Sequence, residues 1–392
     1  MIPSPAMTQD GAFHVVVFTD TFFETNGVGS YYKTLLNWCR HNSGMYVTIV
    51  CPARDDQIVG RIGNNVVPVH PRGQFRNPFY RDLTLGLYSL PQLRAIVERL
   101  SGPKVIHIAT SGPLGVAGAK LARLMKLNSV GCYHTDLQKC ARLYGASMLH
   151  RPGGWVGAKI GRYFDRHAYE RCRAICVPAE SAAETPRTYF QGEIAVIPNP
   201  IDLDHFTPGA DRCGEFRERY NHDGKILVVV VGRVAREKNL DLVCNHLSGD
   251  PRINTVFVGD GPYSWHLRRR WNATVTGFLA GDELRSAYQQ ADVFVQLSVA
   301  ETFGLTLVEA MASGLPAVVL RSRGFADSIP PGNGVEVIEE HEVATLADRC
   351  VALVSDAERH REYSRRARAF VGRISADRVL PRFMEFHRSF AR

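Results

Sequence analysis

Several features that mark particular classes of protein are missing from this sequence of 392 residues. No apolar run approaches the ~18–20 residues that a membrane-spanning helix needs, so we expect any membrane contact to be peripheral. Residues 1–12 have neither a basic start nor an apolar core, so no signal peptide is predicted. The absence of internal repeats and low-complexity segments argues against solenoid and fibrous classes.

Metal and disulfide patterns are also missing. The nine cysteines are scattered and form no Cys-x-x-Cys pair. The closest two, Cys172 and Cys176, have no second pair with which to complete a zinc site. We therefore expect reduced, mostly buried cysteines and a cytosolic protein. Asp202-Leu203-Asp204 spells an Asp-x-Asp motif, but it lies in a connection without partner ligands, so we interpret it as structural and predict no metal.

The composition sets the scale and the charge. The length indicates about two domains, and a hydrophobic content of 45% is enough for two cores. The net charge of +8 favours an anionic partner, which could be a nucleotide, an acidic lipid surface or a nucleic acid. The basic residues have no interleaved exposed aromatics and match no nucleic-acid module, so no nucleic-acid partner is predicted.

Apolar runs alternate with helical segments along the whole chain, which predicts α/β architecture with parallel sheets covered on both faces. A proline-marked connection, Ile197–Asp202, divides the pattern into residues 1–197 and 198–375. The predicted strands are Phe13–Phe18, Tyr46–Cys51, Val105–Ile108, Val130–Tyr133, Ala174–Val177, Ile194–Ile197, Ile226–Val231, Val256–Val258, Val293–Leu297 and Ala317–Leu320. In such sheets, ligands bind beyond the carboxyl ends of the strands.

The stretch Val299–Pro316 follows one predicted strand and combines a loop with a helix over Leu305–Ala312. Gly304 stands at the helix start, where unpaired N–H groups and the helix dipole favour an anion. Glu301 lies in the loop, and Glu309 lies among apolar helix residues. A buried carboxylate needs hydrogen-bond donors, such as a sugar or ribose diol, although a capping or solvated glutamate is equally compatible with the residues alone.

Three further segments at strand ends carry candidate site residues. Gly27 and Gly29 form a second glycine-containing loop before a helix, a weak signal by itself. Arg233 and Lys238 follow another strand and could clamp a diphosphate, although a solvated basic loop is common. His134 also follows a strand, where a satisfied polar residue is the more usual interpretation.

The segment Trp155–Phe164 has helical periodicity after the sequence Pro152-Gly153-Gly154, which we expect to break the chain. Its apolar residues, such as Val156 and Ile160, share one face, and its basic residues share another. We favour an ordinary amphipathic helix packed on the sheet, and keep the basic patch as a candidate contact with an anionic membrane.

The pattern Glu-x-Phe-Gly-x4-Glu-Ala-x-Ala-x-Gly-x-Pro over 301–316 closely resembles the signature of family 4 retaining glycosyltransferases of the GT-B fold. That resemblance implies two doubly wound Rossmann-like domains that face each other across a cleft. It implies that 198–375 binds a nucleotide sugar, while 1–197 lies on the acceptor side and 376–392 crosses back to it. The implied donor-binding residues are Gly27, Gly29, Arg233, Lys238, Phe278, Phe303, Gly304, Leu305, Thr306 and Glu309.

Two segments resemble the glycolipid-forming members of the same family: Thr-Asp followed by aromatics and Asn-Gly-Val, and Tyr-His-Thr-Asp at 133–136. This resemblance implies that His134 and Glu301 act on the transferred sugar and that Asp136 lies on the acceptor side. Where relatives continue with Gly-Gly and a glutamate, this chain has Arg321–Asp327, a departure on the donor side.

The expected activity is retaining transfer of a hexose from a UDP- or GDP-sugar to a hydroxyl of a glycerolipid or glycolipid, without a metal or other cofactor. A soluble sugar or small alcohol is the alternative acceptor, and a silent sugar-nucleotide-binding relative is the alternative function. A glycoside hydrolase could also use two carboxylates, but it needs a paired acid and base beside water. We expect a peripheral position on an anionic, cytoplasmic membrane face.

Overall fold

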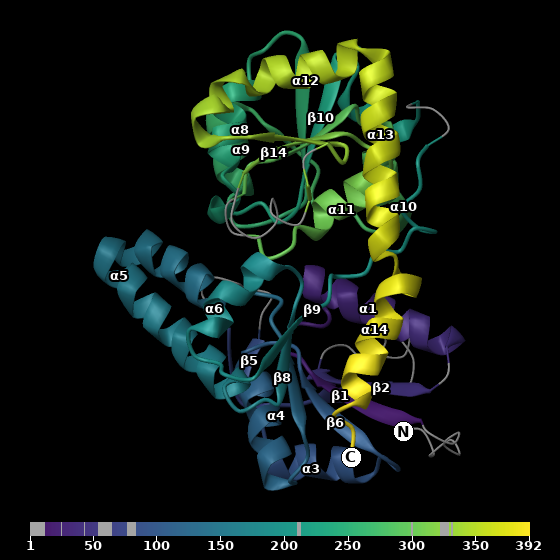
Figure 1. Cartoon of the computed structure of the whole chain (residues 1–392). Coiled ribbons are helices and arrows are strands. Elements are labelled where there is room, and N and C mark those ends of the chain that lie inside the picture. Colours follow the sequence, from purple (N-terminus) through teal and green to yellow (C-terminus); the bar gives the residue numbers. More distant parts are fainter. Residues whose placement is uncertain are drawn as a thin grey trace. The chain divides into compact units, whose positions relative to one another are not determined.

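The computed structural model describes residues 12–24, 26–42, 44–53, 65–76, 84–209, 213–298, 301–321, 329–330 and 332–392. Its contacts divide the chain into two compact units (Figure 1). The first unit comprises Met1–Pro200 with Ala376–Arg392, and the second comprises Ile201–Ser375. The sequence had suggested a division after residue 197 and a return to the first domain at 376.

The first unit is built on a seven-stranded sheet with the order β3-β2-β1-β6-β7-β8-β9, in which all neighbouring pairs are parallel. Its strands are β1 (Phe13–Phe18), β2 (Met45–Pro52), β3 (Val66–Val69), β6 (Lys104–Ile108), β7 (Ser129–Cys132), β8 (Ala174–Val177) and β9 (Glu193–Val196), with β4 (Arg72–Arg76) and β5 (Thr84–Leu87) as a separate antiparallel pair. Its helices are α1 (Gly27–His41), α3 (Leu90–Glu98), α4 (Pro113–Leu124), α5 (Leu137–Tyr169), α6 (Glu184–Arg187) and α14 (Ala376–Arg388).

The second unit is built on a six-stranded parallel sheet with the order β12-β11-β10-β13-β14-β15. Its strands are β10 (Ile226–Val231), β11 (Ile253–Val258), β12 (Thr274–Val275), β13 (Val293–Gln296), β14 (Ala317–Leu320) and β15 (Val335–Ile338). Its helices are α7 (Glu215–Tyr220), α8 (Leu240–Leu247), α9 (Ser264–Trp271), α10 (Gly281–Gln290), α11 (Leu305–Ala312), α12 (Leu346–Ser355) and α13 (Ala357–Val371).

The continuous apolar strand β10 shows why the parallel sheets were predictable. Leu227 and Val229 pack in one core cluster, while Val228 and Val230 pack in another on the opposite face. Because side chains alternate along a strand and both faces are covered by helices, every position is apolar rather than every second one. Each predicted strand is present, with ends that differ from the prediction by a few residues at most.

Both sheets reverse their strand order once, which creates a topological switch point. In the first sheet the order turns at β1 and β6, and in the second it turns at β10 and β13. Loops after the strands on either side of such a point leave a crevice in which open α/β sheets bind their ligands. The segments that follow β10 and β13 contain Arg233, Lys238 and Glu301.

The helix α5 agrees with one expectation and contradicts another. Its backbone is helical through Pro152 and the two glycines after it, but the chain reverses direction between Gly145 and Gly154, near the break that we had expected. The two halves lie side by side in antiparallel directions, since a Cβ atom on Gly157 would lie 2.1 Å from the carbonyl oxygen of Ala141, and one on Gly161 would lie 2.7 Å from Cα of Gln138. Glycine therefore permits a close contact between the helical segments that a side chain would prevent.

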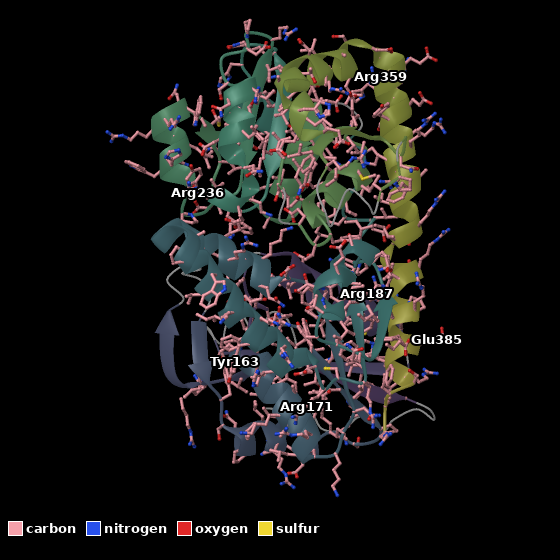
Figure 2. The ribbon with its side chains drawn as sticks, turned by 60° about the vertical axis from the view of Figure 1, so that its left-hand side comes forward. Tyr163, Arg171, Arg187, Arg236, Arg359 and Glu385 are labelled. Atoms are coloured by element: carbon pink, nitrogen blue, oxygen red, sulfur yellow. The ribbon has the colours of Figure 1, made fainter. Side chains whose placement is uncertain are left out.

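The apolar face of α5 is exposed rather than packed on the sheet, which corrects the favoured interpretation. The α5 apolar stripe consists of Trp155, Val156, Ile160 and Tyr163, with 62% of Trp155 and 53% of Ile160 exposed. Tyr163 is labelled in Figure 2. Lys159 extends over the Trp155 ring, with Nζ 3.7 Å from the ring centroid. Within the described residues, no helix combines the length and apolar character needed to cross a bilayer.

Candidate functional site

The helix α11 begins at Gly304, whose backbone is left-handed with φ of 78°. Glycine is the residue that adopts this conformation at little cost, which explains its position at the turn from loop to helix. Leu305 and Thr306 follow in the first turn and are partly exposed. Since the first N–H groups of a helix have no intrahelical acceptors, this turn can donate hydrogen bonds to an anion.

Glu309 lies one turn further along α11 and is only 8% exposed. Oε2 of Glu309 accepts a hydrogen bond of 2.8 Å from the hydroxyl of Tyr288 on α10. Burial raises the pKa of Glu309 to about 7, and the bond from Tyr288 opposes that rise only in part. The carboxylate therefore accepts a hydrogen bond from Tyr288 and remains able to accept bonds from a ligand diol.

Lys238 and Glu301 form an ion pair between the segments that follow β10 and β13. Burial is the largest influence on both groups and disfavours their charges, but their mutual attraction outweighs it. The pKa of Lys238 is raised and that of Glu301 is lowered, with further bonds from Ser298 and Gln296 to the carboxylate. Both side chains are thus charged at neutral pH, and each holds the other.

Arg233, directly after β10, pairs with Glu237 four residues later. Arg233, Lys238 and Glu301 line a cavity of about 20 Å³ at this end of the sheet. That volume holds about one water molecule and is too small for a diphosphate. The two cations that were expected to clamp the diphosphate are therefore paired with carboxylates of the protein. A sugar nucleotide can enter here only if these side chains move.

Two expected donor-binding aromatics lie in contrasting environments. Phe278, after β12, is 55% exposed, so its ring is available to a nucleotide base. Phe303 is buried in the apolar core that includes Leu307 and Val308. The ring of Phe303 therefore stabilises the start of α11 from inside, and the expected donor contact of this residue remains a prediction.

The glycine loop of the first unit has a defined local structure. Asn26 caps α1, and its side-chain oxygen accepts a bond of 2.9 Å from the N–H of Gly29. A Cβ atom on Gly29 would lie 2.9 Å from the carbonyl oxygens of Phe22 and Glu24, so glycine is required for packing. Gly27 is the first residue of α1. The expected donor contacts of both glycines remain predictions.

His134 follows β7 and is buried at one end of a chain of hydrogen bonds. Nε2 of His134 lies 3.1 Å from the hydroxyl of Tyr32, which lies 2.6 Å from Nε2 of His107. Nδ1 of His107 lies 2.8 Å from Nε2 of His387, on α14. Burial lowers the pKa of His134 to about 4, opposed by a hydrogen bond with Asn199, so the ring is neutral at pH 7.

Sequence reasoning missed Tyr32, His107 and His387. His107 stands in a predicted strand, and His387 stands in the segment 376–392 that was expected to cross back to the first domain, so neither position marked a site residue. Tyr32, His107 and His387 are linked to His134 only because α1, β6 and α14 pack together. No local spacing could have indicated a contact that spans 280 residues.

Asp136 and Asp20, both from segments that resemble relatives, have structural partners. Asp136 caps α5 by accepting from the N–H of Lys139 at 2.9 Å and from the hydroxyl of Thr185 at 2.8 Å. Asp20 is buried and accepts from the N–H of Leu114 at 2.8 Å, at the start of α4. The acceptor role of Asp136 remains a prediction, and capping alone accounts for its position.

Metal ligation has no support among the described residues, which contain no group of three His, Cys, Asp or Glu side chains that could hold an ion. Asp202 of the Asp-x-Asp motif accepts from the backbone N–H groups of Asp204 and His205, each at 3.0 Å. The motif therefore forms a turn, and the expectation that no metal binds remains a prediction. Most of the Arg321–Asp327 departure lies outside the described residues.

Two protein-family models match this chain. The model described as Glycosyltransferase Family 4 matches residues 25–205, and the model described as Glycosyl transferases group 1 matches residues 214–370. The two matches follow the two structural units closely.

Three curated relatives are informative. The chain is 30% identical to the GDP-mannose-dependent alpha-mannosyltransferase of Mycolicibacterium smegmatis over 322 residues, which are 81% of this chain and 82% of that relative. It is 31% identical to the sulfoquinovosyl transferase SQD2 of Arabidopsis thaliana over 264 residues, 65% of this chain but half of that relative. It is 28% identical to the alpha-monoglucosyldiacylglycerol synthase of Streptococcus pneumoniae over 230 residues, 55% of this chain and 51% of that relative.

Among solved structures, Anabaena HepE in complex with UDP-glucose has the same fold, with a TM-score of 0.75 at 14% identity and coverage of 96% of this chain and 99% of that chain. At that identity the likeness concerns the fold alone. Taken with the matches in sequence, it leads to one conclusion: the chain belongs to glycosyltransferase family 4, has the GT-B fold, and resembles the branch of that family that forms glycolipids.

Proposed function

We propose that this glycosyltransferase moves a hexose from a UDP- or GDP-sugar to a hydroxyl of a glycerolipid or glycolipid, with retained configuration and without a metal. The observation that carries the proposal is the grouping, within the second unit, of a helix start, two cations and two glutamates around the β10–β13 switch point. This grouping offers donors for a diphosphate and acceptors for sugar and ribose hydroxyls.

The donor would bind in two linked events. The ribose diol donates to Glu309, which has spare acceptor capacity beside Tyr288. The diphosphate meets the N–H groups of Leu305 and Thr306 and draws Lys238 away from Glu301. That exchange replaces one anionic partner of Lys238 by another, and it frees the Glu301 carboxylate for the hydroxyls of the sugar.

In the transfer step, the acceptor oxygen forms a bond to the anomeric carbon while the bond from that carbon to the phosphate oxygen breaks. The electron pair leaves with the diphosphate, and the acceptor proton passes to the departing phosphate oxygen. Arg233, Lys238 and the first turn of α11 stabilise the charge on the leaving group. Fixed donors of this kind contribute roughly 3–4 kcal/mol each to the transition state.

His134 is proposed to hold a hydroxyl of the transferred sugar from the first unit, and Asp136 to lie on the acceptor side. Because burial lowers its pKa to about 4, His134 acts as a neutral hydrogen-bonding group and not as an acid at pH 7. The fixed orientation of its ring supports positioning of the sugar.

The lipid acceptor is supported by the α5 apolar stripe and by the name of the monoglucosyldiacylglycerol synthase relative. Exposed Lys159, Arg162 and Arg166 lie on the same helix as the stripe, which is the combination that binds anionic bilayers from one side. We infer peripheral attachment to a cytoplasmic membrane face.

The decisive experiment incubates the purified chain with a panel of UDP- and GDP-hexoses and diacylglycerol vesicles, with a chelator present. We expect release of nucleotide diphosphate and formation of an α-glycolipid. Glu309→Ala should mainly weaken donor binding, whereas His134→Ala should mainly lower turnover. Donor hydrolysis without lipid product would indicate a different acceptor, and wild-type kinetics in both variants would refute the assigned roles.

A further inference from the structure

A second cavity lies within the second unit, at the opposite end of α11 from Gly304. It has a volume of about 600 Å³ and is lined by parts of 208–209, 288–291, 313–315 and 360–369. This volume is within the range of sites for small molecules, roughly 300–1,000 Å³. The proposed donor residues Arg233, Lys238 and Glu301 do not line it.

The lining of this cavity is cationic and contains no carboxylate. Arg361, Ser364, Arg365 and Arg368 recur at helical spacing on α13 and present one face to it. Arg368 is engaged, since it donates to backbone carbonyls of Phe206 and Ala312. Arg368 therefore shapes the cavity, whereas the other two arginines supply its available charge.

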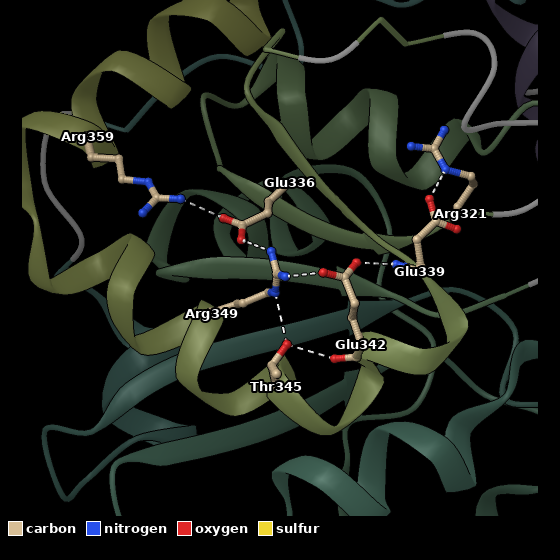
Figure 3. A network of polar contacts seen from close by, with 7 residues as sticks. All are labelled: Arg321, Glu336, Glu339, Glu342, Thr345, Arg349 and Arg359. Atoms are coloured by element: carbon tan, nitrogen blue, oxygen red, sulfur yellow. Dashed lines mark hydrogen bonds and ion pairs between the residues drawn. The ribbon is translucent and has the colours of Figure 1, made fainter.

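Other arginines of α13 form ion pairs with glutamates, unlike the arginines that line the cavity. Arg359 pairs with Glu336 within the network of Figure 3, and Arg366 pairs with Glu362. Within the described part of the chain, neither Arg361 nor Arg365 has an acidic partner. Two guanidinium groups four residues apart, facing a concave surface without carboxylates, form a site for an anion.

Hydroxyl groups complete the set of donors. Ser313 lines the cavity, is 4% exposed, and its hydroxyl has no hydrogen-bond partner among the described residues. Ser364 also lines the cavity, and a Cβ atom on Gly314 would lie 2.9 Å from its hydroxyl. Gly314, with φ of 71°, therefore keeps this wall open. Guanidinium and hydroxyl donors together are the groups that bind phosphate oxygens.

We propose that this cavity binds a small molecule that carries a phosphate group, separately from the sugar-nucleotide donor. Arg361 and Arg365 bind the phosphate, and the remaining volume accommodates the group to which it is esterified. Tyr288 contributes to the cavity wall, and its hydroxyl bonds to Glu309. The site thus lies one side chain away from the carboxylate that we assign to the ribose.

Calorimetric titration of the full chain tests the proposal without any need for transferase activity. The probes are inorganic phosphate, inorganic pyrophosphate and ribose 5-phosphate. We expect Arg361→Gln/Arg365→Gln to weaken probe binding by at least about tenfold, while Arg366→Gln, on the same helix but paired with Glu362, leaves it within about twofold. Tighter binding of ribose 5-phosphate than of phosphate would identify an ester as the ligand, and equal affinity would identify free phosphate.

A variant at the donor site separates the two sites. Arg233→Gln should bind inorganic phosphate and ribose 5-phosphate as tightly as the wild type; pyrophosphate is excluded from this comparison, because we assign Arg233 to the diphosphate of the donor. If Arg233→Gln loses binding while Arg361→Gln/Arg365→Gln keeps it, the probe occupies the donor site and the proposal is overturned. A dissociation constant weaker than about 1 mM for all three probes would also overturn it.

Discussion

Nδ1 of His107 and Nε2 of His387 lie 2.8 Å apart, and this contact determines which ring nitrogen carries the proton in each histidine of a hydrogen-bonded series. Nδ1 of His387 lies 2.8 Å from the carbonyl oxygen of Phe383, which can only accept, so that nitrogen carries the proton. Since His387 is neutral, its Nε2 accepts from His107, and His107 in turn accepts from the hydroxyl of Tyr32. The oxygen of Tyr32 is then left to accept from Nε2–H of His134.

The first prediction concerns the hydrogen bonds that link His387 to His134 through His107 and Tyr32. His387→Leu removes the acceptor that fixes His107, so His107 and Tyr32 can reverse and His134 loses its defined tautomer. We expect the turnover number to fall by about tenfold with an unchanged KM for the donor. The unpaired buried groups should also lower the free energy of unfolding by about 1–3 kcal/mol.

His41→Ala is the control, because His41 is exposed on α1 and its Nδ1 lies 3.2 Å from the carbonyl oxygen of Asn37, one turn earlier in the same helix. Nitrogen NMR of the histidine rings should show the Nε2–H form of His134 in the wild type and a mixture in His387→Leu. A pure Nε2–H form in the variant would contradict the positioning role, whatever its stability.

The second prediction follows from the buried carboxyl of Glu309. Burial raises its pKa from 4.5 to about 7. Between these values the folded protein keeps the proton while the unfolded chain has lost it, so the free energy of unfolding falls as the pH rises. The contribution is at most about 3 kcal/mol. Above pH 7 both states are ionised and the effect is complete.

Glu309→Gln removes this titration. Urea denaturation at intervals from pH 4.5 to 8 should show that the wild type loses stability relative to the variant across that window. Glu283→Gln, an exposed position on α10, should follow the wild type. Parallel curves for the wild type and Glu309→Gln would mean that the carboxyl is ionised throughout.

The third prediction concerns the pair formed by Lys238 and Glu301, whose side chains are 26% and 16% exposed. Each single change, Lys238→Met or Glu301→Gln, leaves a largely buried charge without its partner. We expect a loss of about 1–3 kcal/mol for each, less than for a fully buried pair. The double variant should recover part of the loss.

A double-mutant cycle measures the coupling from urea denaturation. The exposed pair Arg94–Glu98 is a suitable reference, with side chains 63% and 50% exposed. Its coupling should be below about 0.5 kcal/mol. Equal coupling energies for the two pairs would show that water reaches Lys238 and Glu301 as freely as the surface pair.

The fourth prediction tests the α5 apolar stripe. Trp155→Ser/Ile160→Ser should reduce binding to vesicles that contain anionic lipid by at least about tenfold, because two exposed apolar groups no longer enter the interface. Binding of the wild type should weaken as salt is raised. Co-sedimentation measures both effects.

Trp265→Ser is the matched control. Trp265 is also exposed and has Arg269 over its ring at 5.2 Å, but it belongs to the second unit. Its substitution should leave vesicle binding unchanged. Equal losses for the two variants would indicate unspecific adsorption of exposed tryptophans.

Local chemistry explains why much of the second unit could be predicted from the sequence. The uninterrupted apolar run Ile226–Val231 is typical of a strand in a parallel sheet that is covered on both faces. Gly304 is the residue that a left-handed turn favours. The partners of the site residues were less accessible. Glu237 is four residues from Arg233, a recognisable helical spacing, but Glu301 is 63 residues from Lys238.

The environment of α5 was predicted wrongly for a related reason. Apolar residues at helical spacing are the same whether the face packs on a sheet or meets solvent. The close backbone contact at Gly157 turns the glycines inward and leaves Trp155 and Ile160 outside. Periodicity identifies a face, but only the packing partner shows which way the face points.

The sequence by itself determined the alternation of strands and helices, the glycine turns and the residue types suited to a sugar nucleotide, because these depend on neighbours within a few positions. The tertiary structure alone decided that Lys238 and Arg233 are paired with carboxylates, that Phe303 belongs to the core, and that His387 is linked to His134 through His107 and Tyr32. These outcomes depend on burial and on contacts between distant segments, where desolvation sets the energy of each charge and hydrogen bond.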